Sequence, residues 1–241
     1  MYSNKKKQIF LLHFAGGSCY SFDFLRHGIQ NNFECHALEL PGRGKRNHED
    51  HLFNKRDAVL DYVSQIKRLR NDQPYIIYGH SMGATLGLSV VKKLEEDSDA
   101  PNVLIVSGNS GPGSNHKDIQ RHTLSDPEFK EVLRSLGGVP EEVLENEDLY
   151  DFFSPIMRAD FEILEKNRDS EIGLVINTPI FAIMGDEEET VGEIENWERF
   201  TSSEFDCQIV PGNHFFIHNQ VKTLTQIINK YGTYSLLNVI V

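Results

Sequence analysis

Short apolar runs alternate with longer amphipathic ones along the chain. Six runs rich in Ile, Val, Leu and Phe, each bounded by Gly, Pro or charged residues, predict β-strands. They cover residues 8–14, 34–40, 75–78, 103–107, 179–184 and 205–210. Between them, apolar residues recur at helical spacing and predict helices over residues 55–70, 84–95, 193–201 and 216–231. This alternation predicts an α/β fold, with a mainly parallel sheet and helices on both faces.

Residues 111–173 interrupt the alternation because they contain no convincing strand. They hold helix starts instead: Ser125-Asp126-Pro127-Glu128 combines a capping residue, an early proline and a capping-box glutamate. Pro140 opens a second helix and Ser154-Pro155 a third. The segment leaves the C-terminal end of a strand, where open α/β sheets bind ligands. We therefore expect a helical lid inserted into a single domain of residues 1–241; a helical excursion without a functional role is the alternative.

Composition and charge narrow the possible partners. The 241 residues carry 24 Lys and Arg against 36 Asp and Glu, so the net charge is −12. This charge argues against a nucleic-acid partner and against adsorption to an anionic membrane. The apolar C-terminal stretch, residues 235–241, is too short to cross a bilayer. Three cysteines without a C-x-x-C pair indicate neither a disulfide framework nor a zinc site, which favours a cytoplasmic location.

The motif G-x-S-x-G at Gly79-His80-Ser81-Met82-Gly83 carries the strongest chemical signal. The bare pattern is weak, but here a predicted strand enters it and a predicted helix leaves it. This is the setting of a nucleophile elbow, whose tight turn needs glycines on either side of a serine in a strained backbone conformation. We expect an exposed Ser81 hydroxyl beside a helix N-terminus that stabilises negative charge. An idle serine in a Gly-rich turn is the alternative.

A serine nucleophile needs a base, and the base needs a carboxylate. Among ten histidines, His214 follows the last strand and should lie level with the elbow, whereas His218 should pack or face water. We expect His13, His36 and His80 to be structural.

Asp186 ends the strand that precedes the last one and is the favoured acid, because its short side chain is best held there. The next three residues, Glu187, Glu188 and Glu189, compete with it or form a solvated acidic run. The order Ser81, Asp186, His214 is that of α/β-hydrolases.

The oxyanion hole requires two backbone N–H groups. One is expected from Met82, which follows the nucleophile. The other is expected from Ala15, since Gly16-Gly17 after the first strand lets the backbone approach closely. A phosphate-binding loop is not indicated, because the chain contains no G-x-x-x-x-G-K-[ST] motif. No cofactor and no metal are expected.

In their order along the chain, these segments resemble the stand-alone type II thioesterases that accompany nonribosomal peptide and polyketide synthases. The resemblance covers nearly the whole chain. It rests on Phe14-Ala15-Gly16-Gly17-Ser18, Leu40-Pro41-Gly42-Arg43-Gly44, Gly79-His80-Ser81-Met82-Gly83, Leu124-Ser125-Asp126, Leu136-Gly137-Gly138, Arg158-Ala159-Asp160-Phe161, Gly185-Asp186 and His214-Phe215-Phe216. Two positions depart from the family pattern: His13 stands where proline is common, and Asn213 where glycine is common.

The resemblance implies that the enzyme hydrolyses stalled or wrongly loaded acyl groups from the phosphopantetheine arm of acyl and peptidyl carrier proteins, its transient partners. The lid would form the acyl chamber. Carrier proteins are usually acidic, so Arg43, Lys45 and Arg46 are candidates for local docking, against the alternative of a solvated surface.

Three other functions remain open from the sequence. A general carboxylesterase or lipase and an acyltransferase or cyclising thioesterase would use the same catalytic residues. A non-catalytic binding scaffold derived from a hydrolase would not need them.

Overall fold

The computed structural model describes residues 5–114, 120–166 and 168–233, so the apolar stretch 235–241 lies outside the described part of the chain. All six predicted strands are present, with ends that differ by at most three residues. They are β1 (Lys7–Leu12), β2 (Phe33–Ala37), β3 (Tyr75–His80), β4 (Leu104–Ser107), β5 (Ile180–Gly185) and β6 (Phe205–Val210). They form one sheet in the order β2-β1-β3-β4-β5-β6, and every neighbouring pair is parallel. The predicted mainly parallel α/β sheet is confirmed.

Helices cover both faces of the sheet. Helices α1 (Asp23–Ile29) and α7 (Val221–Thr233) pack together on one face, and α2 (Lys55–Leu69) and α3 (Met82–Glu96) pack together on the other. Alternate strand residues feed the two cores: Ile9 and Leu11 of β1 face α1 and α7, whereas Phe10 and Leu12 face α2 and α3. Since both faces of the sheet are buried, the strand sequences are nearly continuous runs of apolar residues.

Two expected helices differ in detail, and one helix of the structure was not expected. Residues 193–201 form part of a 3₁₀ helix, η4 (Val191–Phe200). The helix expected over 216–231 is divided in two. A 3₁₀ turn, η5, covers Phe216–His218, and α7 begins only at Val221. The seven-residue α1 was not expected, since so short a helix carries only two fully buried side chains, Leu25 and Ile29.

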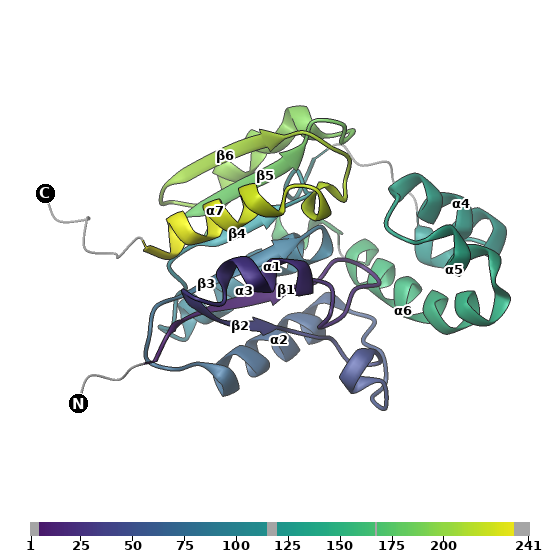
Figure 1. Cartoon of the computed structure of the whole chain (residues 1–241), viewed down its shortest axis with the longest axis horizontal. Helices are drawn as coiled ribbons and strands as arrows, with labels where there is room; N and C mark the ends of the chain where they lie inside the picture. The colour runs from purple at the N-terminus through teal and green to yellow at the C-terminus, as the bar shows by residue number, and fades with distance from the viewer. Residues whose placement is uncertain (1–4, 115–119, 167, 234–241) are drawn as a thin grey trace, which may run out of the picture.

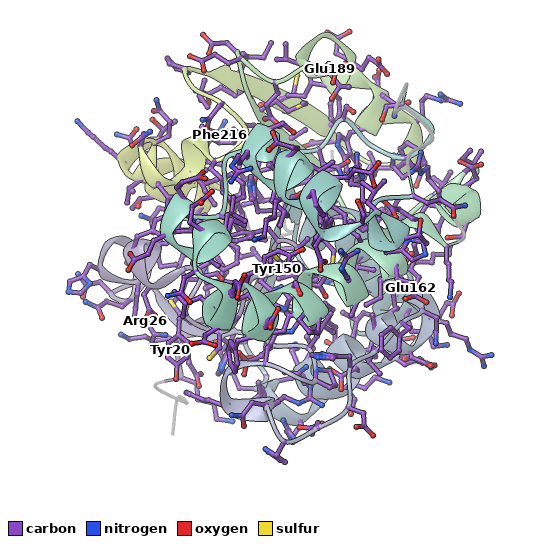
Figure 2. All side chains as sticks on the ribbon, turned by 90° about the vertical axis from the view of Figure 1, so that its right-hand side faces the viewer. Tyr20, Arg26, Tyr150, Glu162, Glu189 and Phe216 are labelled. Atoms are coloured by element: carbon purple, nitrogen blue, oxygen red, sulfur yellow. The ribbon has the colours of Figure 1, made fainter. Side chains whose placement is uncertain are left out.

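The described part of the segment between β4 and β5 consists mainly of helices, as predicted, which lie beyond one end of the sheet (Figure 1). It contains η2 (Arg121–Thr123), α4 (Asp126–Leu136), α5 (Glu141–Glu145), α6 (Glu147–Glu165) and η3 (Arg168–Glu171). Figure 2 looks at this end of the molecule, with Tyr150 near the middle of the face. The helices enclose a small apolar core of their own, formed by Phe129, Leu133, Leu144, Tyr150, Met157 and Phe161. We call residues 121–171 the helical insertion.

The helix starts within the insertion were predicted with one error. Glu128 accepts hydrogen bonds from the Ser125 N–H at 3.1 Å and its hydroxyl at 2.6 Å, which fits the predicted start of α4. However, α6 begins well before Ser154-Pro155, because the Asn146 side chain accepts the Leu149 N–H and caps the helix there. Pro155 lies inside α6 and removes one N–H donor without ending the helix. None of the described helices is long and apolar enough to span a membrane.

Candidate active site

Ser81 lies in the sharp turn between β3 and α3, in a backbone conformation with φ 54° and ψ −111°. Non-glycine residues rarely adopt a positive φ, so the expected strained elbow is observed. The flanking glycines are required by close backbone contacts. A Cβ on Gly79 would lie 2.1 Å from the Gly83 carbonyl oxygen, and one on Gly83 would lie 2.2 Å from the Leu12 carbonyl oxygen. The turn therefore holds the serine at the N-terminus of α3, at the carboxyl edge of the sheet.

His214 reaches the serine from the loop after β6. Its Nε2 atom lies 3.0 Å from Ser81 Oγ, although the two residues are 133 positions apart. The loop is fixed by Asn213, whose side chain accepts the Phe215 N–H at 3.0 Å. Asn213 does not need the left-handed conformation, because the preceding Gly212 takes a positive φ of 127°. Asparagine in place of the family's glycine is therefore compatible with the turn.

The carboxylate beside His214 belongs to Glu188. Glu188 Oε2 lies 2.8 Å from His214 Nδ1, and its Oε1 accepts the Gly185 N–H at 2.8 Å. A turn in which the Glu188 N–H bonds to the Gly185 carbonyl brings the side chain back to the edge of the sheet. Only 7% of the Glu188 side chain is exposed.

The favoured acid, Asp186, is placed elsewhere, and the structure corrects this prediction. Asp186 is exposed, and its Oδ1 accepts the Gly212 N–H at 2.8 Å. Its short side chain therefore braces the loop that carries His214 instead of meeting the imidazole. The tight turn after β5 points the residue at the strand end outward, and the longer glutamate two residues later reaches back.

The three side chains form one hydrogen-bonded line. Because a carboxylate only accepts hydrogen bonds, His214 Nδ1 carries the proton shared with Glu188. Nε2 is then left with a lone pair that accepts from the Ser81 hydroxyl. A base oriented in this way can take the hydroxyl proton when the oxygen attacks a carbonyl carbon. The arrangement is suited to nucleophilic acyl chemistry.

The two expected oxyanion donors start from neighbouring positions. Leu12 at the end of β1 pairs with Gly79 in β3, so the loop carrying Ala15 and the elbow carrying Met82 leave adjacent strands. Met82 is the first residue of α3, where the backbone N–H has no partner within the helix. Among the described residues, neither amide donates to a protein acceptor.

His80 lies under the catalytic candidates in a fully buried position. Its Nδ1 is 2.8 Å from Ser107 Oγ, which also meets the Tyr78 hydroxyl at 2.8 Å. The ring centroid is 5.1 Å from that of His214. Burial, followed by the charges that His214 and His218 can carry, lowers the pKa of His80 well below its usual range. This neutral, enclosed imidazole fits the structural role expected for it.

His13 holds the loop of the candidate oxyanion hole. Its Nδ1 donates to the Phe14 carbonyl at 2.8 Å, and its Nε2 accepts the Leu40 N–H at 3.4 Å. The second bond requires the neutral imidazole, because a protonated Nε2 could not accept the Leu40 N–H. Burial, with the nearby Arg43 charge, lowers the pKa of His13 from 6.5 to about 4. Histidine thus supplies two backbone contacts at the position where proline is common in the family it resembles.

Replacing His13 with Asn should reduce the pH dependence of stability. The unfolded chain protonates His13 near pH 6.5 and the folded protein only near pH 4, so the unfolded state binds more protons between these values. Lowering the pH from 7 to 5 should therefore reduce the free energy of unfolding of both proteins, and the reduction should be about 2 kcal/mol larger in the wild type than in the variant. Urea titrations at the two pH values measure this difference. Equal pH dependence would show that His13 is not held neutral.

Two of the three cations considered for docking are engaged within the protein. Arg43 is only 3% exposed and binds Asp160 of α6. Arg46 forms paired hydrogen bonds with Glu49 and with Asp61. Neither a solvated surface nor a docking role fits the buried Arg43. The sequence offers no local signal for this contact, because Asp160 lies 117 residues away.

Comparison with known proteins identifies the family. The family model described as a thioesterase domain matches residues 7–233. A curated relative, the gramicidin S biosynthesis protein GrsT of Aneurinibacillus migulanus, is 31% identical over 95% of this chain and 90% of its own length.

Solved structures show the same overall fold. ClbQ from the colibactin NRPS/PKS pathway superposes with a TM-score of 0.86, at 27% identity over 94% of this chain and 97% of its own. The type II thioesterase BorB from the borrelidin biosynthetic cluster gives a TM-score of 0.85, at 27% identity over 95% and 94%. The six-stranded sheet is thus that of the α/β-hydrolase fold. A serine elbow met by a histidine, within a match that runs from the first strand to the last helix, places this chain in the thioesterase family.

Proposed function

We propose that this enzyme hydrolyses acyl groups from the phosphopantetheine arm of carrier proteins and so removes stalled or wrongly loaded intermediates from nonribosomal peptide or polyketide synthases. The observation that carries the proposal is that His214 is hydrogen-bonded to both Ser81 and Glu188 in a chain of the thioesterase family. The names of its relatives support the biosynthetic setting: GrsT belongs to gramicidin S biosynthesis and BorB is a type II thioesterase.

The catalytic residues in this proposal are Ser81, His214 and Glu188. Ser81 Oγ attacks the thioester carbonyl carbon while His214 Nε2 takes the hydroxyl proton, and Glu188 stabilises the imidazolium. The amides of Met82 and Ala15 donate to the oxyanion that forms on the carbonyl oxygen.

Collapse of the tetrahedral intermediate breaks the C–S bond and leaves an acyl ester on Ser81. A thiol has a pKa near 8.5, so the sulfur leaves with less proton donation than an alkoxide needs. His214 returns its proton to the thiolate and then takes one from a water molecule, which attacks the ester and releases the acid. Ser81 regains its hydroxyl proton, and no redox step or cofactor is involved.

The helical insertion is proposed to be the lid of a single domain. Its helix α6 packs against the candidate oxyanion loop, since a Cβ on Gly16 would lie 2.9 Å from Met157 Cγ. Residues near this contact would meet the acyl chain of a bound substrate.

The partners proposed are carrier proteins bound transiently, because a chain of net charge −12 offers no long-range attraction to an acidic partner. The three free cysteines support a cytoplasmic location.

The thioester on a carrier protein should be preferred over a simple oxygen ester with the same acyl chain. We expect kcat/KM to be about tenfold or more higher for the carrier-bound thioester, because contacts with the carrier and the arm add to binding of the transition state. Steady-state hydrolysis of the carrier substrate, the acyl N-acetylcysteamine thioester and the p-nitrophenyl ester separates carrier recognition from thioester chemistry.

The two catalytic alternatives each have their own outcome in this assay. A higher kcat/KM for the oxygen ester would favour a general carboxylesterase. Mass spectrometry of the product distinguishes hydrolysis from transfer: a free acid supports the proposal, whereas an ester, an amide or a ring indicates an acyltransferase or cyclising enzyme.

A further inference from the structure

The loop that carries Ala15 is held on both sides of this residue. Before it, the Phe14 carbonyl accepts hydrogen bonds from His13 Nδ1 at 2.8 Å and from the Gly17 N–H at 2.9 Å. After it, the Gly16 N–H donates to Asp160 Oδ2 at 2.8 Å. Gly16 has a φ of 77°, which favours glycine. Because each peptide unit is planar, these bonds fix the two peptide planes that meet at the Ala15 Cα.

Asp160 reaches this loop from α6, in the helical insertion, and is completely buried. A buried carboxylate is stable only when it is paired and hydrogen-bonded. Arg43 supplies the partner: its two terminal nitrogens lie 2.5 and 2.8 Å from the two Asp160 oxygens. The guanidinium also donates to the Gly17 carbonyl at 3.4 Å. The carboxylate and the guanidinium together therefore contact two successive residues of the loop.

The positive charge of Arg43 offsets the negative charge of Asp160 beside the oxyanion hole. An unpaired carboxylate next to an oxyanion hole would repel the negative charge that develops in the transition state. Paired with Arg43, Asp160 can hold the Gly16 N–H as a strong acceptor with its charge offset. The pair thus tethers the loop without adding net charge beside it.

We propose that Asp160 is a positioning residue for the oxyanion hole: it tethers the Gly16 N–H from the helical insertion and thereby orients the Ala15 N–H toward the oxyanion. This inference rests on the proposed function, in which Ala15 supplies one oxyanion donor. It also makes the oxyanion hole depend on α6 being docked, since the tether comes from that helix. A purely structural ion pair is the alternative, and it does not require the bond to Gly16.

Two double variants separate the tether from the ion pair. In R43M/D160N the charges are gone, but the carbonyl of the introduced amide side chain can still accept the Gly16 N–H. In R43M/D160L the charges and the acceptor are both gone. Replacing both members of a buried pair is tolerated far better than removing one, so both proteins should fold. We expect kcat of R43M/D160L to be about tenfold or more below that of R43M/D160N, with KM changed by less than about threefold.

A boronic acid provides a readout that is independent of the substrate. An alkyl boronic acid forms a tetrahedral adduct with Ser81 and places an oxygen in the oxyanion hole. Its dissociation constant should be about tenfold higher for R43M/D160L than for R43M/D160N, while the melting temperatures of the two proteins agree. Equal kcat and equal boronate affinity in the two variants would overturn the proposal, as would a kcat loss accompanied by an equal loss of folded protein.

Two controls keep the outcomes distinguishable. If the wild type hydrolyses no thioester, the proposed function fails, but the boronate comparison still tests the tether. If R43M/D160L does not fold, the pair R43Q/D160N and R43Q/D160M repeats the comparison, because Gln keeps a donor toward Gly17 and the flexible Met side chain adapts to an irregular space. The same tenfold difference is expected for this pair.

Discussion

Replacing Ser81 with Ala is expected to lower kcat for thioester hydrolysis by about 10³–10⁶-fold without unfolding the protein. The variant loses the only atom that attacks the carbonyl, while the backbone at position 81 keeps the same positive-φ penalty for alanine as for serine. The only hydrogen-bond partner of the hydroxyl among the described residues is His214. Release of free acid from an acyl carrier protein measures the loss, and circular dichroism checks the fold.

The same experiment includes the base and a matched control. His214→Ala should cost nearly as much as Ser81→Ala, since both members of the proton-transfer pair are needed. His218→Ala removes an imidazole four residues later whose ring lies 4.7 Å from that of Phe24. This variant should keep kcat within about threefold of the wild type. Near-normal hydrolysis by either the Ser81 or the His214 variant would contradict the proposed mechanism.

The elbow and the base could be predicted because their signals are local. A buried strand, a glycine-flanked serine and an apolar helix stand next to one another, and the resulting turn follows from sterics alone. His214 could be chosen because it directly follows the last strand of a parallel sheet, and the carboxyl ends of such strands share one edge.

The contacts around Arg43 could not be predicted, because they depend on tertiary packing. In sequence, Arg43 sits in a polar Gly-rich loop and reads as a surface cation. Its burial follows only once α6 lies against the loops that follow β1 and β2 and supplies Asp160. The start of α6 was missed for a related reason: Pro155 indicated a new helix, but the cap at Asn146 and the buried Tyr150 extend the helix in front of it.

The carboxylate that contacts His214 was mispredicted, because its position depends on a single turn. Asp186 and Glu188 are two residues apart, and both follow a strand that points at the catalytic edge. Periodicity and composition do not say whether the chain continues straight or turns back after Gly185. The bond from the Glu188 N–H to the Gly185 carbonyl defines that turn and places the longer side chain at His214.

Replacing Glu188 with Gln should therefore lower kcat by about 10²–10⁴-fold, whereas Asp186→Asn should lower it by less than about tenfold. Gln keeps the size of the side chain but removes the charge that stabilises the His214 imidazolium. Asn at 186 can still accept the Gly212 N–H through its side-chain carbonyl. Steady-state kinetics of the two variants on one acyl carrier substrate gives the comparison.

The ranking of the two variants identifies the acid, and a double variant tests whether it belongs to the same unit as the nucleophile. A greater loss in Asp186→Asn than in Glu188→Gln would return the role to Asp186. If Glu188 acts only through His214 on the Ser81 hydroxyl, adding Glu188→Gln to Ser81→Ala should slow the remaining hydrolysis by less than about threefold, because residues of one catalytic unit are strongly non-additive. A full further loss of about 10² or more would mean that Glu188 supports the active site by another route, such as holding the turn at Gly185.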